Sequence, residues 1–317
     1  MKPKHLFLGC GVIVLCFFML LVFIVLVQSA FLKGTKIKKG GKIGVVEISG
    51  VIHSGGSTGG PFSESTAGSD SIVRALKKGM EDKSIKAILL HINSPGGSPA
   101  GSYEIYSQVM AMRGKGKPIV VSMGDVAASG GYYIAAAGET VFANPSTLTG
   151  SIGVRMGNLN WYGLMKEYGV EDMTIKAGKH KDIGSPFRPI SDEERALLQE
   201  SVDNIHAQFI RDVAAGRGVR ERDIREYATG MIFTGEQAKQ INLVDRIGTY
   251  HDAVDYAARK ARIKGEPELI NLKEDGFFPF FQTAASKIAG MPLDPRTAGR
   301  LDSMVQNLLL ATELAPR

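Results

Sequence analysis

Short apolar runs alternate with amphipathic stretches through the middle of the chain. Runs rich in β-branched residues at 42–52, 85–92 and 118–123 are typical of buried strands. Apolar residues at helical spacing follow at 71–83 and 99–113. This alternation predicts an α/β fold built from repeated strand and helix units.

The helical pattern continues in the second half of the chain. The longest predicted helix covers residues 191–215, with Ser191 as its N-cap and Glu194 completing a capping box. A further helix at 254–261 closes the domain, and after Gly265 the pattern weakens. We therefore expect one folded domain over 42–264 and a C-terminal extension, 265–317, to which the pattern assigns no structure.

The N-terminus carries a different kind of apolar segment. Residues 6–27 form a run of 22 residues without a charge, about 33 Å long as a helix, which matches the hydrocarbon core of a bilayer. A cleavable signal peptide is the alternative, because small residues follow at Ser29 and Ala30. The run exceeds an ordinary signal-peptide core of about 7–15 residues, which favours an uncleaved anchor. Residues 1–41 are thus expected to be a cytoplasmic stub, a transmembrane helix and a basic linker.

Charge and cysteine content limit the classes of function. The net charge of +6 comes without an interleaved basic and aromatic pattern, so nothing indicates nucleic-acid binding. Both cysteines, Cys10 and Cys16, lie in the apolar segment, so we expect no disulfide in the folded domain. More lysines follow the anchor than precede it, and a literal positive-inside count would place the folded domain in the cytoplasm.

The first candidate for chemistry is Ser129, in the sequence GDVAASGGYY at 124–133. It follows a predicted strand and lies in a predicted small-residue helix, 127–137. A serine there is near the positive end of the helix, and the flanking glycines let a substrate approach the backbone. Taken alone, an N-cap serine in a glycine-rich turn is the simpler interpretation.

Two further segments change that balance. Residues 93–97, NSPGG, follow the strand at 85–92, and their two glycines leave backbone N–H groups unobstructed, as an oxyanion hole requires. Residues 177–186, AGKHKDIGSP, contain Lys179 and Lys181. A lysine acts as a general base for serine only where burial or neighbours lower its pKa. For NSPGG the alternative to an oxyanion hole is a tight turn. For the segment with the two lysines, the alternative to a catalytic base is a solvated basic loop.

The histidines are poorly placed to act as a catalytic base, and the residues that could bind a metal lack the required spacing. His206 falls within the long predicted helix, and His91 is interpreted as a packed strand residue. His180 adjoins Lys181, but neighbouring loop side chains need not point the same way; the other histidines are His5, His53 and His251. A Ser-Lys pair is therefore favoured over a Ser-His-Asp triad. No His/Cys/Asp/Glu cluster has the spacing of metal ligands, so neither a metal nor another cofactor is expected.

Together these segments resemble the short form of the signal peptide peptidase family of the SppA type. The matching sequences are INSPGG, GDVAASGGYY, LTGSIGV at 148–154 and GKHKDIGSPFR, and the resemblance covers about 42–262. Members are membrane-anchored bacterial Ser-Lys proteases related in fold to ClpP and the crotonases. The resemblance thus implies a ClpP/crotonase-like core of repeated ββα units, preceded here by one N-terminal transmembrane helix.

The resemblance also implies roles for individual residues. Ser129 matches the nucleophile, Lys181 the general base, and Ser151 the serine that orients the lysine. Gly96 and the N–H of Gly130 match the oxyanion donors. Only the family match distinguishes Lys181 from Lys179.

The function implied is a membrane-anchored serine endopeptidase that degrades remnant signal peptides and other apolar peptides. The resemblance places the catalytic domain on the outer face of the cytoplasmic membrane, and we follow it over the charge count because large domains translocate regardless of local charge. It also implies a ring-like homo-oligomer whose neighbouring subunits complete each site. The alternatives are a crotonase-like acyl-CoA enzyme and a non-catalytic membrane scaffold that retains the fold.

Overall fold

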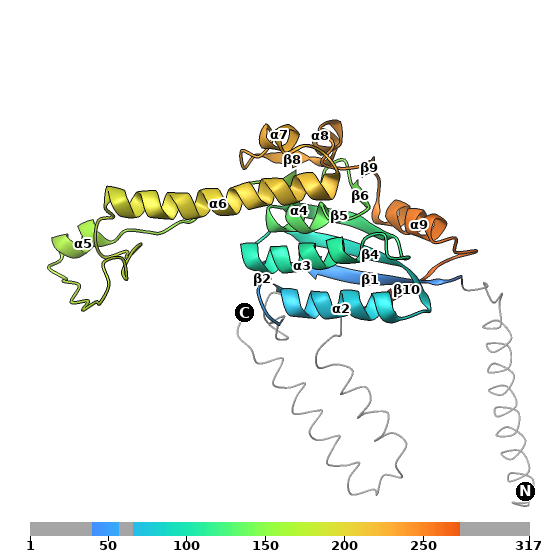
Figure 1. Cartoon of the computed structure of the whole chain (residues 1–317), viewed down its shortest axis with the longest axis horizontal. Coiled ribbons are helices and arrows are strands. Elements are labelled where there is room, and N and C mark those ends of the chain that lie inside the picture. The colour runs from blue at the N-terminus through green and yellow to red at the C-terminus, as the bar shows by residue number, and fades with distance from the viewer. Residues whose placement is uncertain (1–39, 57–65, 273–317) are drawn as a thin grey trace, which may run out of the picture. The chain divides into compact units, whose positions relative to one another are not determined.

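The computed structural model describes residues 40–56 and 66–272 (Figure 1). The expected anchor at 6–27 and nearly all of the C-terminal extension lie outside these residues. Among the helices of the described ranges, none combines the length and the apolar character needed to cross a bilayer. The anchor therefore stays a prediction from the sequence.

An eight-stranded sheet organises the domain. Its main path runs β10-β1-β4-β5-β6-β9, with all neighbours parallel, and β7 joins β5 in parallel and β8 in antiparallel. The strands are β1 (Lys42–Ser49), β4 (Ile85–Ser94), β5 (Ile119–Ala128), β6 (Thr140–Ala143), β7 (Leu148–Gly150), β8 (Ile232–Thr234), β9 (Arg246–Ile247) and β10 (Glu268–Asn271). Two short strands, β2 (Ile52–His53) and β3 (Ala67–Gly68), pair separately. The result is the α/β architecture that the sequence predicts, with a mixed sheet.

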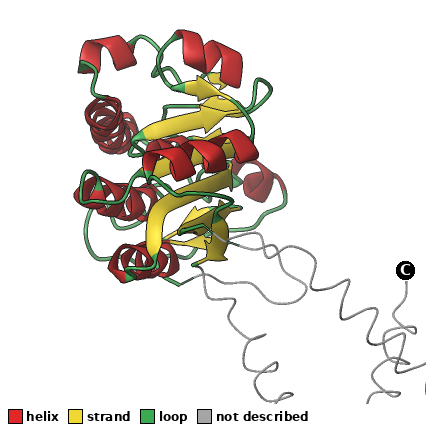
Figure 2. Cartoon of the chain, turned by 90° about the vertical axis from the view of Figure 1, so that its right-hand side faces the viewer, coloured by secondary structure: helices red, strands yellow, loops and turns green. Residues whose placement is uncertain are grey.

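Helices cover both faces of this sheet (Figure 2). Those of the described ranges are α2 (Ser69–Glu81), α3 (Pro99–Met112), α4 (Gly130–Ala135), α5 (Tyr162–Glu167), α6 (Asp192–Arg217), α7 (Glu221–Arg225), α8 (Gly235–Gln240) and α9 (Tyr250–Lys260). In β4, Ile88 and Leu90 pack in the core cluster with α2, α3 and α4, whereas Ala87 and Leu89 pack against α9. Burial on both faces explains why these strands are continuous apolar runs.

Two boundaries differ from the sequence prediction. The helix expected over 127–137 begins only at Gly130, because Ala127 and Ala128 continue β5 and pair with Thr149 and Gly150 of β7. This pairing with a distant segment overrides the helical propensity of alanine. In addition, β10 pairs with β1, so the sheet continues past residue 264.

Helix α6 links two very different environments. The predicted capping box is present: the Glu194 N–H donates to Ser191 Oγ, and the Ser191 N–H donates to the Glu194 carboxylate. Its C-terminal half packs in the core through Phe209, Ile210 and Val213. In contrast, none of residues 153–193 is buried. We call this segment the arm; Figure 1 shows α5 and its loops at the N-terminal end of α6, away from the sheet.

Candidate active site

Ser129 lies at the junction between β5 and α4, in a strained backbone conformation. Its φ is 51° and its ψ is −121°, a region that residues other than glycine seldom adopt and that is common at functional sites. The Ser129 N–H donates to the Gly150 carbonyl (2.9 Å), and the Ser129 carbonyl accepts from the Tyr133 N–H (2.8 Å). The Ser129 hydroxyl makes no hydrogen bond to any residue of the described ranges. The fold thus fixes the backbone and leaves the oxygen free.

This serine opens into a cavity of about 850 Å³. One wall comes from the segments that the sequence singled out, namely Gly96, Gly97, Gly130 and Ser151. The facing wall is α6, through Gln199, Val202, Asp203, Ile205, His206 and Phe209. A cavity of this size, lined by both apolar and polar groups, is suited to a peptide-sized ligand.

Strand register brings Ser129 and Ser151 together. Ala128 of β5 pairs in parallel with Gly150 of β7, and each of these residues is followed by one of the two serines. Neighbouring strands lie about 4.8 Å apart. The two serines directly follow the paired ends of these strands and therefore lie side by side. Ser151 shares the positive φ of 51°, and its N–H donates to the Met231 carbonyl (2.7 Å).

The glycines beside Ser129 are required by close approach. A Cβ on Gly130 would lie 2.3 Å from Ser102 Oγ, and a Cβ on Gly97 would lie 2.1 Å from the Ile52 carbonyl oxygen. A larger residue at position 97 would clash with backbone, and one at position 130 would have to displace the Ser102 hydroxyl.

The N–H groups of these glycines differ in availability. The Gly96 N–H donates to Ser94 Oγ (3.1 Å). Within the described ranges, the N–H groups of Gly97 and Gly130 make no hydrogen bond. Free backbone N–H groups next to a nucleophile are what a developing oxyanion needs.

Aromatic stacking joins α6 to the helix that follows Ser129. The rings of Phe209 and Tyr133 stack with their centroids 4.5 Å apart, and the Tyr133 hydroxyl donates to the Asp212 carboxylate. Burial and the Asp212 carboxylate raise the pKa of Tyr133, so this phenol stays neutral at working pH. Phe209 is both a core residue and a residue of the cavity wall.

His206 was not singled out by the sequence, yet it lines the cavity. Its Nε2 atom is buried and has no hydrogen-bond partner within the described ranges. The available signal was the helical spacing of Gln199, Val202, His206 and Phe209, which lie on one face of α6. The spacing shows that these residues share a helix face, but it does not show which part of the fold this face contacts.

Lys181 lies apart from this cavity within the single chain. It is exposed on the arm and does not line the cavity. The loop that carries it contacts Glu194. Along α6, Glu194 lies about 7.5 Å from Gln199 at the near end of the cavity wall and about 22 Å from Phe209, which stacks on Tyr133. Lys179 is also exposed, and its Nζ pairs with the Glu193 carboxylate at 2.6 Å. The structure therefore gathers Ser129, Ser151, Gly96 and Gly130 in one site but does not bring Lys181 to it.

Comparison with known proteins gives two family matches. The model of peptidase family S49 matches residues 111–264, and that of Clp protease matches residues 62–149. The first match contains Ser129, Ser151 and Lys181, and the second contains Gly96 and Ser129. The cavity and the arm thus belong to regions that these families describe.

Individual relatives agree with this assignment. A Synechocystis protein named "Putative protease slr0021" is 39% identical over 73% of this chain and 78% of its own length. The "Putative signal peptide peptidase SppA" of Enterococcus faecium is 38% identical over 74% of this chain and 67% of its own length. "Protease 4" of Salmonella typhi is 38% identical over 71% of this chain, which spans only 35% of that longer protein. The chain belongs to peptidase family S49 and is a serine endopeptidase.

Proposed function

We propose that this chain is a membrane-anchored endopeptidase with a Ser-Lys dyad, which degrades remnant signal peptides and other apolar peptides at the cytoplasmic membrane. The observation that carries the proposal is the free hydroxyl of Ser129, held on a strained backbone in a cavity beside Ser151 and the Gly130 N–H. The name of the Enterococcus relative supports the substrate class. The uncharged run at 6–27 supports the anchor. The position of the catalytic domain on the outer face is proposed from the family resemblance alone.

The proposed chemistry is acyl transfer through serine. Ser129 Oγ attacks the scissile carbonyl carbon while Lys181 Nζ takes the hydroxyl proton. The N–H groups of Gly130 and Gly97 stabilise the oxyanion of the tetrahedral intermediate, in place of the Gly96 N–H, which is engaged by Ser94 Oγ. When this intermediate collapses, the proton passes from Lys181 to the leaving amine. Water then hydrolyses the acyl-enzyme with Lys181 again as the base.

Lys181 reaches Ser129, in this proposal, from a neighbouring copy of the chain. The arm exposes ten large apolar side chains: Met156, Leu159, Trp161, Tyr162, Leu164, Tyr168, Val170, Met173, Ile175 and Phe187. An apolar surface of this extent marks an interaction site. We propose a ring-like homo-oligomer in which the arm of each subunit lies over the cavity of the next.

Mixing two inactive variants tests this arrangement. Ser129→Ala and Lys181→Ala should each be inactive toward a signal-peptide-like substrate. In a ring with head-to-tail contacts, random mixing in equal amounts gives one intact Ser-Lys pair in about a quarter of the sites. We expect activity near about one quarter of wild type. Mixtures that stay inactive, although the subunits exchange, would refute a shared site.

Labelling of Ser129 tests the nucleophile separately. A peptide fluorophosphonate should modify the wild-type chain at Ser129 and leave Ser129→Ala unmodified. A crotonase-like acyl-CoA enzyme would use the oxyanion site without this serine, and a non-catalytic scaffold would not be labelled. Membership of a peptidase family already favours the peptidase over both.

A further inference from the structure

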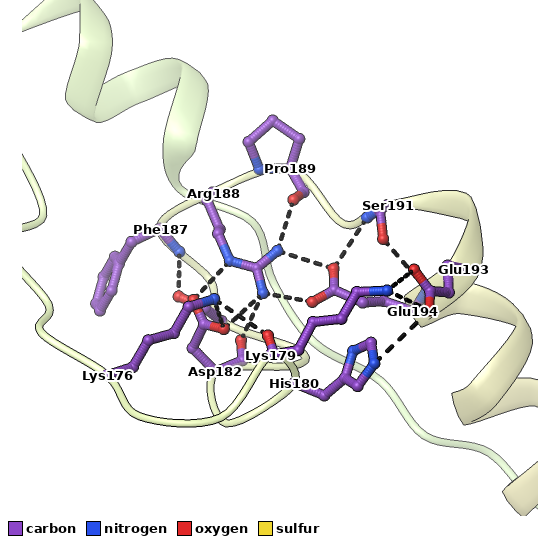
Figure 3. A network of polar contacts seen from close by, with 12 residues as sticks. Lys176, Lys179, His180, Asp182, Phe187, Arg188, Pro189, Ser191, Glu193 and Glu194 are labelled. Atoms are coloured by element: carbon purple, nitrogen blue, oxygen red, sulfur yellow. Dashed lines mark hydrogen bonds and ion pairs between the residues drawn. The ribbon is translucent and has the colours of Figure 1, made fainter.

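The loop that carries Lys181 is held by an arginine between two carboxylates (Figure 3). Arg188 donates from Nε and Nη2 to the two oxygens of Asp182, at 2.8 and 2.9 Å. It donates from Nη1 and Nη2 to the two oxygens of Glu194, at 2.8 and 2.5 Å. Two bidentate contacts from one planar guanidinium fix the geometry more strongly than single ion pairs do.

These contacts join Lys181 to α6. Asp182 directly follows Lys181, and Arg188 also donates to the Asp182 carbonyl at 3.1 Å. Glu194 lies in the first turn of α6, where its carboxylate also accepts the Ser191 N–H at 3.0 Å. The Glu194 side chain is only 7% exposed. Arg188 therefore ties the backbone next to Lys181 to a nearly buried point on the helix.

The same loop is fastened on its other side to the segment that leaves the cavity. The Asn158 side chain donates to the Gly184 carbonyl (3.1 Å), and the Asn160 side chain donates to the Arg188 carbonyl (2.8 Å). The Trp161 N–H donates to the Pro186 carbonyl at 2.6 Å. The loop is thus held in a defined geometry although none of its residues is buried.

The network also engages the acidic groups near Lys181. Asp182 pairs with Lys176 (2.5 Å) as well as with Arg188, and Glu193 pairs with Lys179. Hydrogen bonds from Arg188 and Lys176 hold the pKa of Asp182 well below its usual range, and Arg188 lowers the pKa of Glu194 to about 2. Among the lysines and arginines that the structure describes between residues 176 and 188, Lys181 is the one without an acidic partner.

We propose that Arg188 is a positioning residue for Lys181. It fixes the loop on the first turn of α6, and it keeps the Asp182 carboxylate from pairing with the adjacent lysine. A lysine paired with a carboxylate retains its proton and is a poor base. The planar fork of arginine suits both tasks, whereas lysine cannot make two bidentate contacts. The inference rests on the proposed role of Lys181 as the base.

The main test is the kinetics of Arg188→Gln in the full-length oligomer, with a signal-peptide-like substrate. We expect kcat to fall by about 10- to 100-fold, because a misplacement of about 1 Å costs up to about 100-fold, while KM changes little. The rising limb of the pH profile should move to higher pH as Asp182 turns toward Lys181. The other titratable side chains facing the loop are not substituted in this variant: Lys176, Lys179, His180, Glu193 and Glu194. Arg188→Lys should restore part of kcat.

Two further variants separate positioning from stability. Arg188→Gln leaves Glu194 nearly buried and unpaired, which destabilises the fold. The double variant Arg188→Gln/Glu194→Gln removes that carboxylate, so it should recover thermal stability but not kcat. Arg220→Gln is the matched control, because Arg220 is 65% exposed and pairs only locally with Asp223; it should keep wild-type kcat. A double variant with wild-type kcat and an unchanged pH profile would overturn the proposal.

Mixed oligomers test whether Arg188 acts on the Lys181 side or on the Ser129 side of the proposed shared site. Arg188→Gln mixed with Ser129→Ala should gain activity, because the Ser129→Ala subunit supplies an intact Lys181 loop. Arg188→Gln mixed with Lys181→Ala should not exceed Arg188→Gln alone. The reverse pattern would assign Arg188 to the Ser129 side and contradict the inference. If Ser129→Ala and Lys181→Ala do not complement each other, the shared site itself is wrong, whatever kcat Arg188→Gln shows.

Discussion

The surroundings of Ser129 and of Lys181 are stabilised by different forces. Around Ser129 the main chain is set by parallel strand register and by buried neighbours such as Ala128 and Gly130. Around Lys181 no residue of the arm is buried, and hydrogen bonds and ion pairs centred on Arg188 hold the loop. Ser129, the proposed nucleophile, is thus positioned by the core of its own chain. Lys181, the proposed base, is held by polar contacts on a segment that the core does not support.

The largest effect is expected from crowding the Ser129 side. Gly96 has a φ of +101°, and a Cβ there would lie 2.7 Å from the Gly130 nitrogen and 2.8 Å from Ser129 Cβ. Gly96→Ala should therefore displace the oxyanion donors and lower kcat/KM by about 100-fold or more. Steady-state peptidase kinetics measure this.

A matched control isolates the contribution of backbone strain. Gly114 also has a positive φ, +74°, but a Cβ there would meet nothing within 4 Å. Gly114→Ala should keep near-normal kcat/KM with a small loss of stability. If the two variants lose equal activity, the close approach at Gly96 does not matter.

An intermediate effect is expected on the acid stability of the arm. The pKa of Glu194 is lowered to about 2, chiefly by Arg188, from an unfolded value of about 4.3. Its stabilising contribution is therefore complete above about pH 4.3 and is lost as the pH falls toward about 2. Thermal unfolding of wild type should show a steeper decrease in Tm over that range than Glu194→Gln shows. Parallel curves for the two proteins would contradict the ion-pair account.

The smallest effect is expected at Lys179. This side chain is 69% exposed and pairs with Glu193, which is 55% exposed, so the pair adds little to stability. Lys179→Ala should keep kcat within about twofold and the folded state nearly unchanged, whereas Lys181→Ala should be inactive. An inactive Lys179→Ala together with an active Lys181→Ala would transfer the role of base to Lys179.

Local signals predicted much of the fold. The capping box at Ser191 and Glu194 placed the start of α6, and α2 and α3 lie where apolar spacing indicated them. The end of β5 was not predicted, because it depends on pairing with β7, which is distant in the sequence. The same pairing brings Ser151 beside Ser129, an arrangement that the family resemblance implied and that spacing alone does not give.

Other features of the site depend on contacts that no local pattern encodes. His206 was assigned to a helix, but its place in the cavity wall follows from how α6 packs against Tyr133. The bond between the Gly96 N–H and Ser94 Oγ depends on a side-chain rotamer. The roles of Asp182 and Glu194 follow from the position of Arg188 between them. The sequence indicated Glu194 as part of the capping box of α6 but not its partner Arg188 in the loop.

Cross-linking between Ser129 and Lys181 tests the shared site most directly. In a chain whose natural cysteines, Cys10 and Cys16, are replaced by alanine, the double variant Ser129→Cys/Lys181→Cys carries one thiol at each half of the site. A short bis-maleimide should join different chains and give a ladder of covalent multimers on denaturing gels, and each single-cysteine variant should give no ladder. A cross-link within one chain, at monomer mobility and without multimers, would contradict the account.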